Sequence, residues 1–136
     1  MLERFLDAEL ARRKLPPSAL ALVGFSQGTM MSLHVGLRRA VPPVAIVGYS
    51  GIFVLPEKAA PDAIAGEIRS RPPVLLIHGT QDDLIPVQAL LQSAQALAAL
   101  EVPVEWHLSE GVGHGIDQEG LRHGGEFLAR RFGLRR

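Results

Sequence analysis

Three side chains that together can activate a serine occur in one order along the chain, as Ser26, Asp82 and His114. A serine hydroxyl is a poor nucleophile until a base removes its proton, and a carboxylate has to hold that base in the correct tautomer. The order Ser, Asp, His is that of one of the three main serine hydrolase lineages. Such a set transfers an acyl group to water through a covalent intermediate on the serine.

The predicted nucleophile lies in the segment Gly24-Phe25-Ser26-Gln27-Gly28, which fits the pattern G-x-S-x-G between an apolar strand and an apolar helix. A serine on so sharp a turn needs small residues two positions away on each side, so that strand and helix can approach. The turn places Ser26 at the start of the helix, where the backbone N–H of Gln27 can donate to a developing oxyanion. The alternative is a Gly-Ser turn that only caps a helix.

Five histidines compete for the role of base. His34 is expected to pack in the core of an apolar helix, and His78 and His107 are held within strands. His123 is expected to be solvated on the last helix. His114 alone lies in a glycine-flanked loop directly after a strand, where its ring can reach the edge of a sheet, and we predict it as the base. The alternative is a surface turn.

Two carboxylates, Asp82 and Asp83, follow the third apolar strand. We predict Asp82 as the acid that orients His114 and Asp83 as its solvated neighbour. One of the two is expected to cap the helix that begins near Pro86.

The elements that position these residues alternate between strands and helices. Short apolar runs without polar periodicity, typical of strands covered on both faces, span residues 19–25, 44–49 and 74–78, and a fourth strand is predicted over 104–108. Helices are predicted over 2–14, 30–39, from about 86 to 102, and from a cap at Asp117 to 132, with a short helix near 61–69 inside a long excursion. This order predicts the α/β class, with a mostly parallel sheet of about four strands flanked by helices, in a single domain over 1–136. Ser26, Ser50, Asp82 and His114 follow the carboxyl ends of strands, where ligands collect in such sheets.

Composition excludes several classes of function. Fourteen basic and fourteen acidic residues cancel, which argues against nucleic acid as a partner. The chain has no cysteine, so disulfides and thiolate chemistry are ruled out, and its histidines lack the spacing of metal ligands. No apolar run is long enough to cross a membrane, and acids stand where a signal peptide would be basic, so we expect a cytoplasmic protein without integral membrane association.

Gly24-Phe25-Ser26-Gln27-Gly28, His78-Gly79-Thr80-Gln81-Asp82 with Ile85-Pro86, and Gly113-His114 resemble the phospholipase/carboxylesterase family of α/β-hydrolases, which includes acyl-protein thioesterases. The resemblance covers essentially the whole chain. It implies Ser26 as nucleophile, Asp82 rather than Asp83 as acid, His114 as base, and hydrolysis of small-molecule carboxylic esters or thioesters without metal or cofactor.

The sequence departs from this family at its start. Family members open with several strands and a loop, often His-Gly-x-Gly, that donates a second oxyanion N–H, whereas this sequence starts at the helix before the nucleophile's strand. We therefore expect a truncated α/β-hydrolase, the C-terminal portion of the family fold, which is either a fragment or a naturally short relative.

The departure has three expected consequences. The strand over 19–25 becomes an apolar edge that favours a homo-oligomer. Turnover falls by roughly 10² to 10³ unless a second oxyanion donor is supplied. An open cleft favours short-chain esters. The alternatives are a lysophospholipase or acyl thioesterase, and a catalytically silent domain that acts in assembly.

Overall fold

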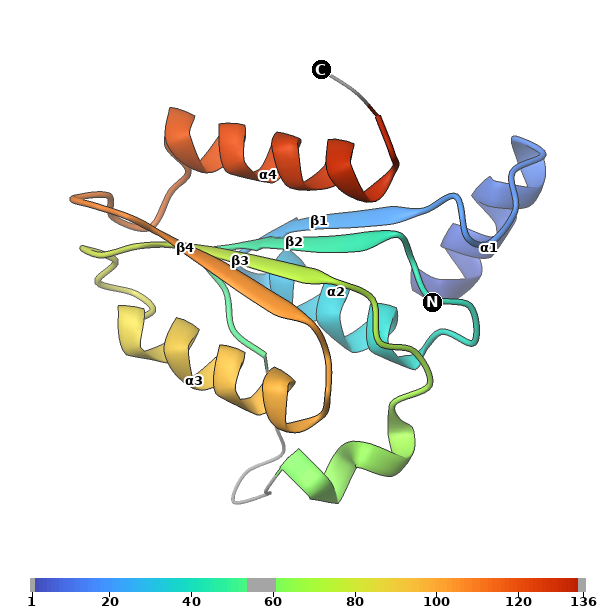
Figure 1. Cartoon of the computed structure of the whole chain (residues 1–136), viewed down its shortest axis with the longest axis horizontal. Coiled ribbons are helices and arrows are strands. Elements are labelled where there is room, and N and C mark those ends of the chain that lie inside the picture. The colour runs from blue at the N-terminus through green and yellow to red at the C-terminus, as the bar shows by residue number, and fades with distance from the viewer. Residues whose placement is uncertain (1, 54–60, 135–136) are drawn as a thin grey trace.

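Four strands form one parallel sheet in which strands adjacent in sequence are also adjacent in space (Figure 1). The computed structural model describes residues 2–53 and 61–134. The strands are β1 (Ala21–Phe25), β2 (Ala45–Tyr49), β3 (Val74–Gly79) and β4 (Val104–Ser109). Their order is β1-β2-β3-β4 and every pairing is parallel, which confirms the predicted α/β class and the predicted sheet.

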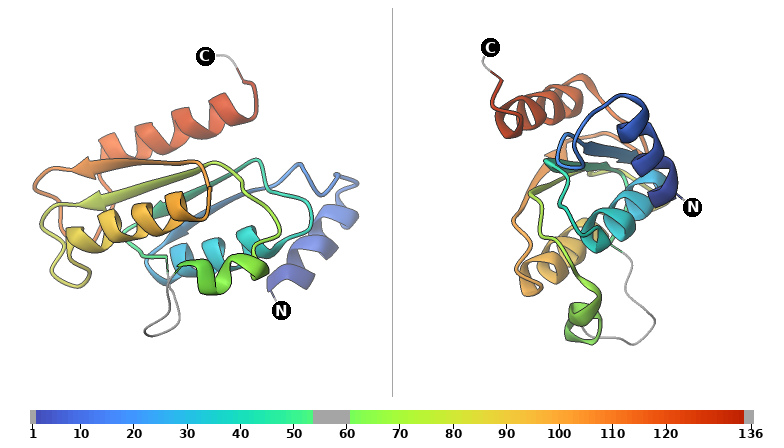
Figure 2. Two further views of the ribbon diagram at one scale, coloured as in Figure 1. Left: turned by 60° about the horizontal axis from the view of Figure 1, so that its bottom comes forward. Right: turned by 90° about the vertical axis from the view of Figure 1, so that its right-hand side faces the viewer.

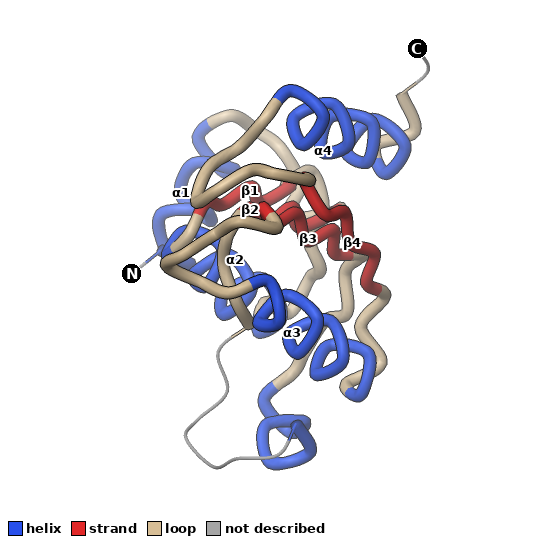
Figure 3. Tube along the Cα trace, turned by 90° about the vertical axis from the view of Figure 1, so that its left-hand side faces the viewer, coloured by secondary structure: helices blue, strands red, loops and turns tan. Residues whose placement is uncertain are grey.

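Helices cover both faces of the sheet. They are α1 (Leu2–Arg12), α2 (Gln27–Arg38), α3 (Val87–Ala99), α4 (Gln118–Arg131) and the 3-10 helix η1 (Pro61–Glu67). An end view of the sheet has α4 on one face and α2 and α3 on the other (Figure 3). The first helix, α1, lies beside α2 near the end where the strands begin (Figure 2). An ion pair between Asp7 and Arg39 at 2.9 Å joins it to the end of α2.

The alternation of side chains along β2 and β3 divides the core between the two faces. Ile46 and Leu76 belong to a larger cluster that includes the apolar stripes of α2 and α3. Val47 and Ile77 point the other way, into a smaller cluster closed by Phe127 of α4. Both central strands are buried along their whole length, as the sequence predicts.

The two outer strands are less covered than the two central strands. On β1, Val23 is 56% and Phe25 is 42% exposed, and on β4 Trp106 is 52% exposed. Each outer strand has one neighbour within the described residues, and α4 packs over β2, β3 and β4 but leaves the same face of β1 open. The prediction of a strand covered on both faces is therefore wrong for β1, and β4 is likewise only partly covered.

The helices differ from the sequence-based predictions at three points: one boundary, one cap and the exposure of one histidine. The second helix begins at Gln27, directly after Ser26, rather than at residue 30. Neither aspartate after β3 caps α3, whose N-cap position is Pro86 and has no side-chain cap hydrogen bond. His34 is exposed rather than packed, because α2 buries the stripe that contains Leu33 and Leu37 and turns His34 outward.

Two other predictions about the helices have a clear outcome. Asp117 caps α4 as predicted and accepts a hydrogen bond from Gly120 N at 2.8 Å. The predicted short helix in the long excursion is η1, while residues 54–60 of that excursion lie outside the described residues. None of the helices over 2–53 and 61–134 combines the length and apolar character needed to span a bilayer.

Candidate active site

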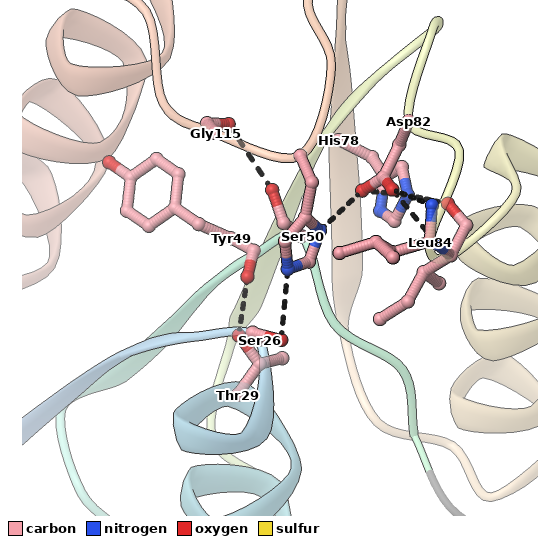
Figure 4. A network of polar contacts seen from close by, with 10 residues as sticks. Ser26, Thr29, Tyr49, Ser50, His78, Asp82, Leu84 and Gly115 are labelled. Carbon is pink, nitrogen blue, oxygen red and sulfur yellow. Dashed lines mark hydrogen bonds and ion pairs between the residues drawn. The ribbon is translucent and has the colours of Figure 1, made fainter.

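The three residues singled out as a catalytic set lie at the carboxyl edge of the sheet, where His114 is hydrogen-bonded to both of the others. Figure 4 labels Ser26 and Asp82 at this edge. Because β1, β3 and β4 are parallel, the loops that follow them leave the same edge. His114 Nε2 lies 3.1 Å from Ser26 Oγ, and His114 Nδ1 lies 2.8 Å from Asp82 Oδ2. The arrangement is a continuous chain from hydroxyl to imidazole to carboxylate, with distances that allow proton transfer from Ser26 to His114.

Ser26 occupies a strained backbone position. Its φ is 56° and its ψ is −114°, a conformation that costs a non-glycine residue on the order of 1–3 kcal/mol. The turn is fixed by a hydrogen bond from Ser26 N to Tyr49 O at 2.8 Å. The buried hydroxyl of Thr29 lies 3.0 Å from Gly24 O and 2.9 Å from Tyr49 O, and so ties the first turn of α2 to β1 and β2. The surrounding packing thus holds the serine in the exposed bend.

The two glycines of the motif play different structural roles. A side chain on Gly24 would overlap the backbone carbonyl group of Gly28, so the close approach of strand and helix requires glycine there, as predicted. A side chain on Gly28 would meet no atom of the described residues within 4 Å, so the predicted need for glycine at Gly28 is not supported. The close backbone approach of helix and strand at this turn therefore depends on Gly24.

The start of α2 presents unpaired donors beside Ser26. Gln27 is the first residue of the helix, and the first N–H groups of a helix have no intrahelical acceptor. The positive end of the helix dipole lies at the same place and favours negative charge. An oxyanion that forms next to Ser26 therefore has a backbone donor within the same turn.

Asp82, and not Asp83, faces His114. The Asp82 side chain is fully buried, and its Oδ1 accepts hydrogen bonds from Leu84 N at 2.9 Å and from Ile85 N at 2.8 Å. Burial alone would raise the pKa of Asp82, but the hydrogen bonds from Ile85 N, from His114 and from Leu84 N outweigh it and hold the pKa below its ordinary value. Asp82 is therefore a carboxylate at neutral pH, while Asp83 is exposed to solvent.

The loop that carries His114 is anchored to its neighbours on several sides. Ser50, at the end of β2, donates to Gly115 O at 3.2 Å, and Gln81 N donates to Val112 O at 2.9 Å. The ring of Phe25 packs against the ring of His114, with centroids 5.0 Å apart. These contacts keep the imidazole between Ser26 and Asp82.

Two of the other histidines, His123 and His78, have surroundings that the sequence did not predict in full. His123 is half-buried rather than solvated, because its ring lies against that of His107 with centroids 3.9 Å apart. His78 is buried at the end of β3, as a strand position predicts, but it also contacts the loop of Asp82. Over the residues that the structure describes, no group of three or more His, Asp or Glu side chains could hold a metal ion.

Sequence reasoning assigned no role to Thr29, Ser50 and His78, which support the set. The sequence gives no sign that the hydroxyl of Thr29 reaches Gly24 O and Tyr49 O, because these contacts depend on the path of the neighbouring strands. The position of Ser50 directly after a strand places it at the same edge of the sheet, but its acceptor, Gly115 O, is 65 residues away in the sequence. His78 belongs to a strand and opens the family-like segment His78-Gly79-Thr80-Gln81-Asp82, but its position four residues before Asp82 gave it no role of its own.

Comparison with known proteins identifies the family of the chain. A model of the phospholipase/carboxylesterase family matches residues 1–131. The chain is 32% identical to acyl-protein thioesterase 1 of Gibberella zeae over 112 residues, which are 82% of this chain and 48% of that protein. It is 38% identical to acyl-protein thioesterase 1 of Schizosaccharomyces pombe over 97 residues, which are 70% of this chain and 40% of that protein. The chain thus spans about half the length of the curated relatives it matches.

Solved structures resemble the chain over most of its length. The crystal structure of esterase PE8 has a TM-score of 0.86 and 43% sequence identity, and the match covers 95% of this chain and 58% of that one. Arabidopsis thaliana SOBER1 has a TM-score of 0.86 at 22% identity, covering 96% of this chain and 61% of that one, and it shows the shared fold. The family match and the fold together place the chain in the phospholipase/carboxylesterase family of α/β-hydrolases.

Proposed function

We propose that this chain carries the catalytic set of a serine carboxylesterase, with Ser26 as nucleophile, His114 as general base and Asp82 as the residue that orients His114. The observation that carries the proposal is the unbroken hydrogen-bonded path from Ser26 Oγ through both ring nitrogens of His114 to the buried Asp82 carboxylate. The strained turn at Ser26 supports it, because such strain persists where a reactive side chain has to be exposed.

The proposed reaction begins with acylation. Ser26 Oγ attacks the carbonyl carbon of the ester while its proton moves to His114 Nε2. The Nδ1–H of His114 remains hydrogen-bonded to Asp82, which stabilises the imidazolium. The carbonyl oxygen becomes an oxyanion that accepts from the N–H of Gln27. When the carbonyl re-forms, the ester bond breaks and the departing alkoxide takes the proton from His114 Nε2.

Deacylation repeats these steps with water. His114 takes a proton from a water molecule, whose oxygen attacks the acyl carbon on Ser26. The second oxyanion collapses, the acid leaves, and the proton on His114 returns to Ser26 Oγ. No metal or cofactor takes part in the proposed steps. With Gln27 as one oxyanion donor, we expect turnover roughly 10² to 10³ below that of a site with two donors, unless a second donor is supplied.

The proposed substrates are small, short-chain esters. Gln27 is exposed and Ser26 is half-buried, so few of the described side chains would enclose a long acyl chain. The proposal expects higher activity on p-nitrophenyl acetate or butyrate than on a long-chain ester. The second candidate activity is hydrolysis of acyl thioesters or lysophospholipids, which is favoured by the relatives named acyl-protein thioesterase.

The decisive experiment labels the purified chain with a fluorophosphonate, which phosphonylates an activated serine. We expect labelling and p-nitrophenyl butyrate hydrolysis in the wild type, and loss of both in Ser26→Ala. Ser18→Ala, a change at an exposed serine between α1 and β1, is the matched control and should behave as wild type. A folded wild type that neither labels nor hydrolyses would contradict the proposal and favour a catalytically silent domain.

We also propose that copies of the chain associate through the edge strand β1. Val23 and Phe25 project apolar side chains from this strand, and its free edge has backbone groups available for pairing. Light scattering at micromolar concentration should detect a homo-oligomer that Val23→Lys weakens. A monomer under those conditions would disprove the association and leave the catalytic proposal intact.

A further inference from the structure

His78 is a buried histidine for which the proposed reaction has no role. Its side chain is 0% exposed and lies at the end of β3, behind the loop that carries Asp82 (Figure 4). The ring nitrogen Nε2 lies 2.7 Å from Ile85 O and 3.4 Å from Asp82 Oδ2. The other nitrogen, Nδ1, is buried and has no hydrogen-bond partner among the described residues.

These contacts fix the protonation state of the His78 ring. A carbonyl oxygen only accepts hydrogen bonds, so the proton that lies between the ring and Ile85 O belongs to Nε2. A proton on Nδ1 as well would leave a buried N–H without an acceptor among the described residues, which is unfavourable. His78 is therefore the neutral ring with its proton on Nε2, and this N–H lies on the side of Asp82 Oδ2.

The same N–H connects the end of β3 to the loop that holds the Asp82 carboxylate. Ile85 N donates to Asp82 Oδ1 at 2.8 Å, and Ile85 O accepts from His78 Nε2. The peptide groups on both sides of Ile85 are thus tied, one to the carboxylate and one to the end of β3. A movement of the segment from Asp82 to Ile85 that turned the carboxylate away from His114 would break one of these hydrogen bonds.

We propose that His78 is a positioning residue that holds Asp82 Oδ2 toward His114, through its Nε2–H and the carbonyl of Ile85. An apolar residue of similar volume would fill the same space and would avoid the unpaired Nδ1, so the directional N–H is what the ring adds. The inference concerns the geometry of the Asp82 loop, and its effect on turnover rests on the proposed function. His78 touches no reacting atom in this scheme.

The test compares amides that place an N–H at different distances from the backbone. The side-chain nitrogen of glutamine reaches the position of Nε2, whereas that of asparagine reaches only the position of Nδ1, where no acceptor lies. We expect His78→Gln to retain kcat for p-nitrophenyl butyrate within about tenfold, and His78→Asn to lose roughly 10²-fold in kcat with little change in KM, as misplaced catalytic groups do. Equal losses in the two variants, or no loss in either, would overturn the proposal.

A second readout does not depend on activity. Nitrogen-detected NMR of the histidine rings in the wild-type chain should show His78 neutral, with its proton on Nε2. The hydrogen-bonded Nδ1–H proton of His114 should persist in His78→Gln and broaden or vanish in His78→Asn, while urea unfolding confirms that each variant is folded. A proton on His78 Nδ1 in the wild type would refute the inference even if His78→Asn fails to fold. If the wild type shows the expected ring signals of His78 and His114 but lacks esterase activity, only the proposed function is refuted.

Discussion

The imidazole of His114 meets the carboxylate of Asp82 through a single oxygen, because Nδ1 lies 2.8 Å from Oδ2 while Oδ1 is occupied by backbone donors. The carboxylate is therefore held from one side by its own loop and presents its other side to the ring. A carboxylate held in this way selects the tautomer of His114 that has a proton on Nδ1 and a free lone pair on Nε2, toward Ser26.

Asp82→Asn is expected to lower kcat for p-nitrophenyl butyrate by about 10⁴-fold, because an amide can stabilise the wrong tautomer of His114. Asp83→Asn is the matched control, since it makes the same chemical change at the exposed neighbour. Its kcat should stay within about twofold of wild type, because Asp83 is solvated and has no role in the proposed reaction. Comparable losses in the two variants would remove Asp82 from the catalytic set.

Gly24→Ala is expected to destabilise the chain by about 1–3 kcal/mol or more, because its methyl group would overlap the backbone of Gly28. Gly28→Ala is the paired change in the same motif and has open space around it. In a helix it should change the free energy of unfolding by less than about 1 kcal/mol, in the stabilising direction. Urea unfolding of both variants measures the difference, and the reverse ranking would contradict the packing at the turn.

Thr29→Val should lower the free energy of unfolding by roughly 1–3 kcal/mol, since Gly24 O and Tyr49 O lose a buried donor. It should also lower kcat, because the turn at Ser26 relaxes. Thr29→Ser keeps the hydroxyl and removes one methyl group, so it should lose about 1 kcal/mol of stability and keep its kcat. A similar fall in kcat for both variants would show that the methyl group, and not the hydroxyl, maintains the turn.

The stability of the chain should fall as the pH is lowered below about 6.5, the ordinary pKa of histidine. Burial and the neighbouring His123 hold the pKa of His107 below that value, although Asp117 and Glu119 partly oppose the shift. Between the lowered pKa and the ordinary one, the unfolded chain binds more protons at this position than the folded chain. The free energy of unfolding therefore falls as the pH drops through this interval, and it levels off at the lower value below the folded-state pKa of His107.

Urea unfolding at pH 7.5, 6.5 and 5.5 tests this dependence. His107→Asn should flatten the change between pH 7.5 and 5.5. His34→Asn alters an exposed histidine on α2 and should leave the dependence as in the wild type. A curve that is unchanged in His107→Asn would show that other groups cause the acid sensitivity.

Much of the fold and of the candidate site could be predicted from the sequence, because the residue patterns that determine them are local. Apolar runs bounded by turn residues mark β2 and β3, and the residues that follow parallel strands have to share one edge. That reasoning brings Ser26 and Asp82 near His114 without any knowledge of the loops. The fold class and the family are confirmed, while the catalytic roles of these residues stay predictions.

The remainder depends on features that composition does not encode. An apolar run indicates that a strand can be buried, but it does not say which neighbour covers it, so the sequence does not reveal the exposure of Val23. A helix that is apolar on nearly every side gives little sign of its outward face, so His34 was misplaced. The role proposed for His78 depends on the path of the Asp82 loop, which is seen in the structure and cannot be derived from the sequence.

The order of the strands makes the candidate site a late reporter of folding. The hydrogen bond between Ser26 and His114 joins residues 88 positions apart, and the one between Asp82 and His114 joins residues 32 apart. Contacts between distant positions require the intervening chain to be ordered first, which slows their formation. Because β2 and β3 lie between β1 and β4, a refolding chain forms the hydrogen bond between Ser26 and His114 only when the whole sheet has assembled. Fluorophosphonate labelling at successive refolding times would then lag behind the recovery of helical signal, and Ser26 would time the completion of the sheet.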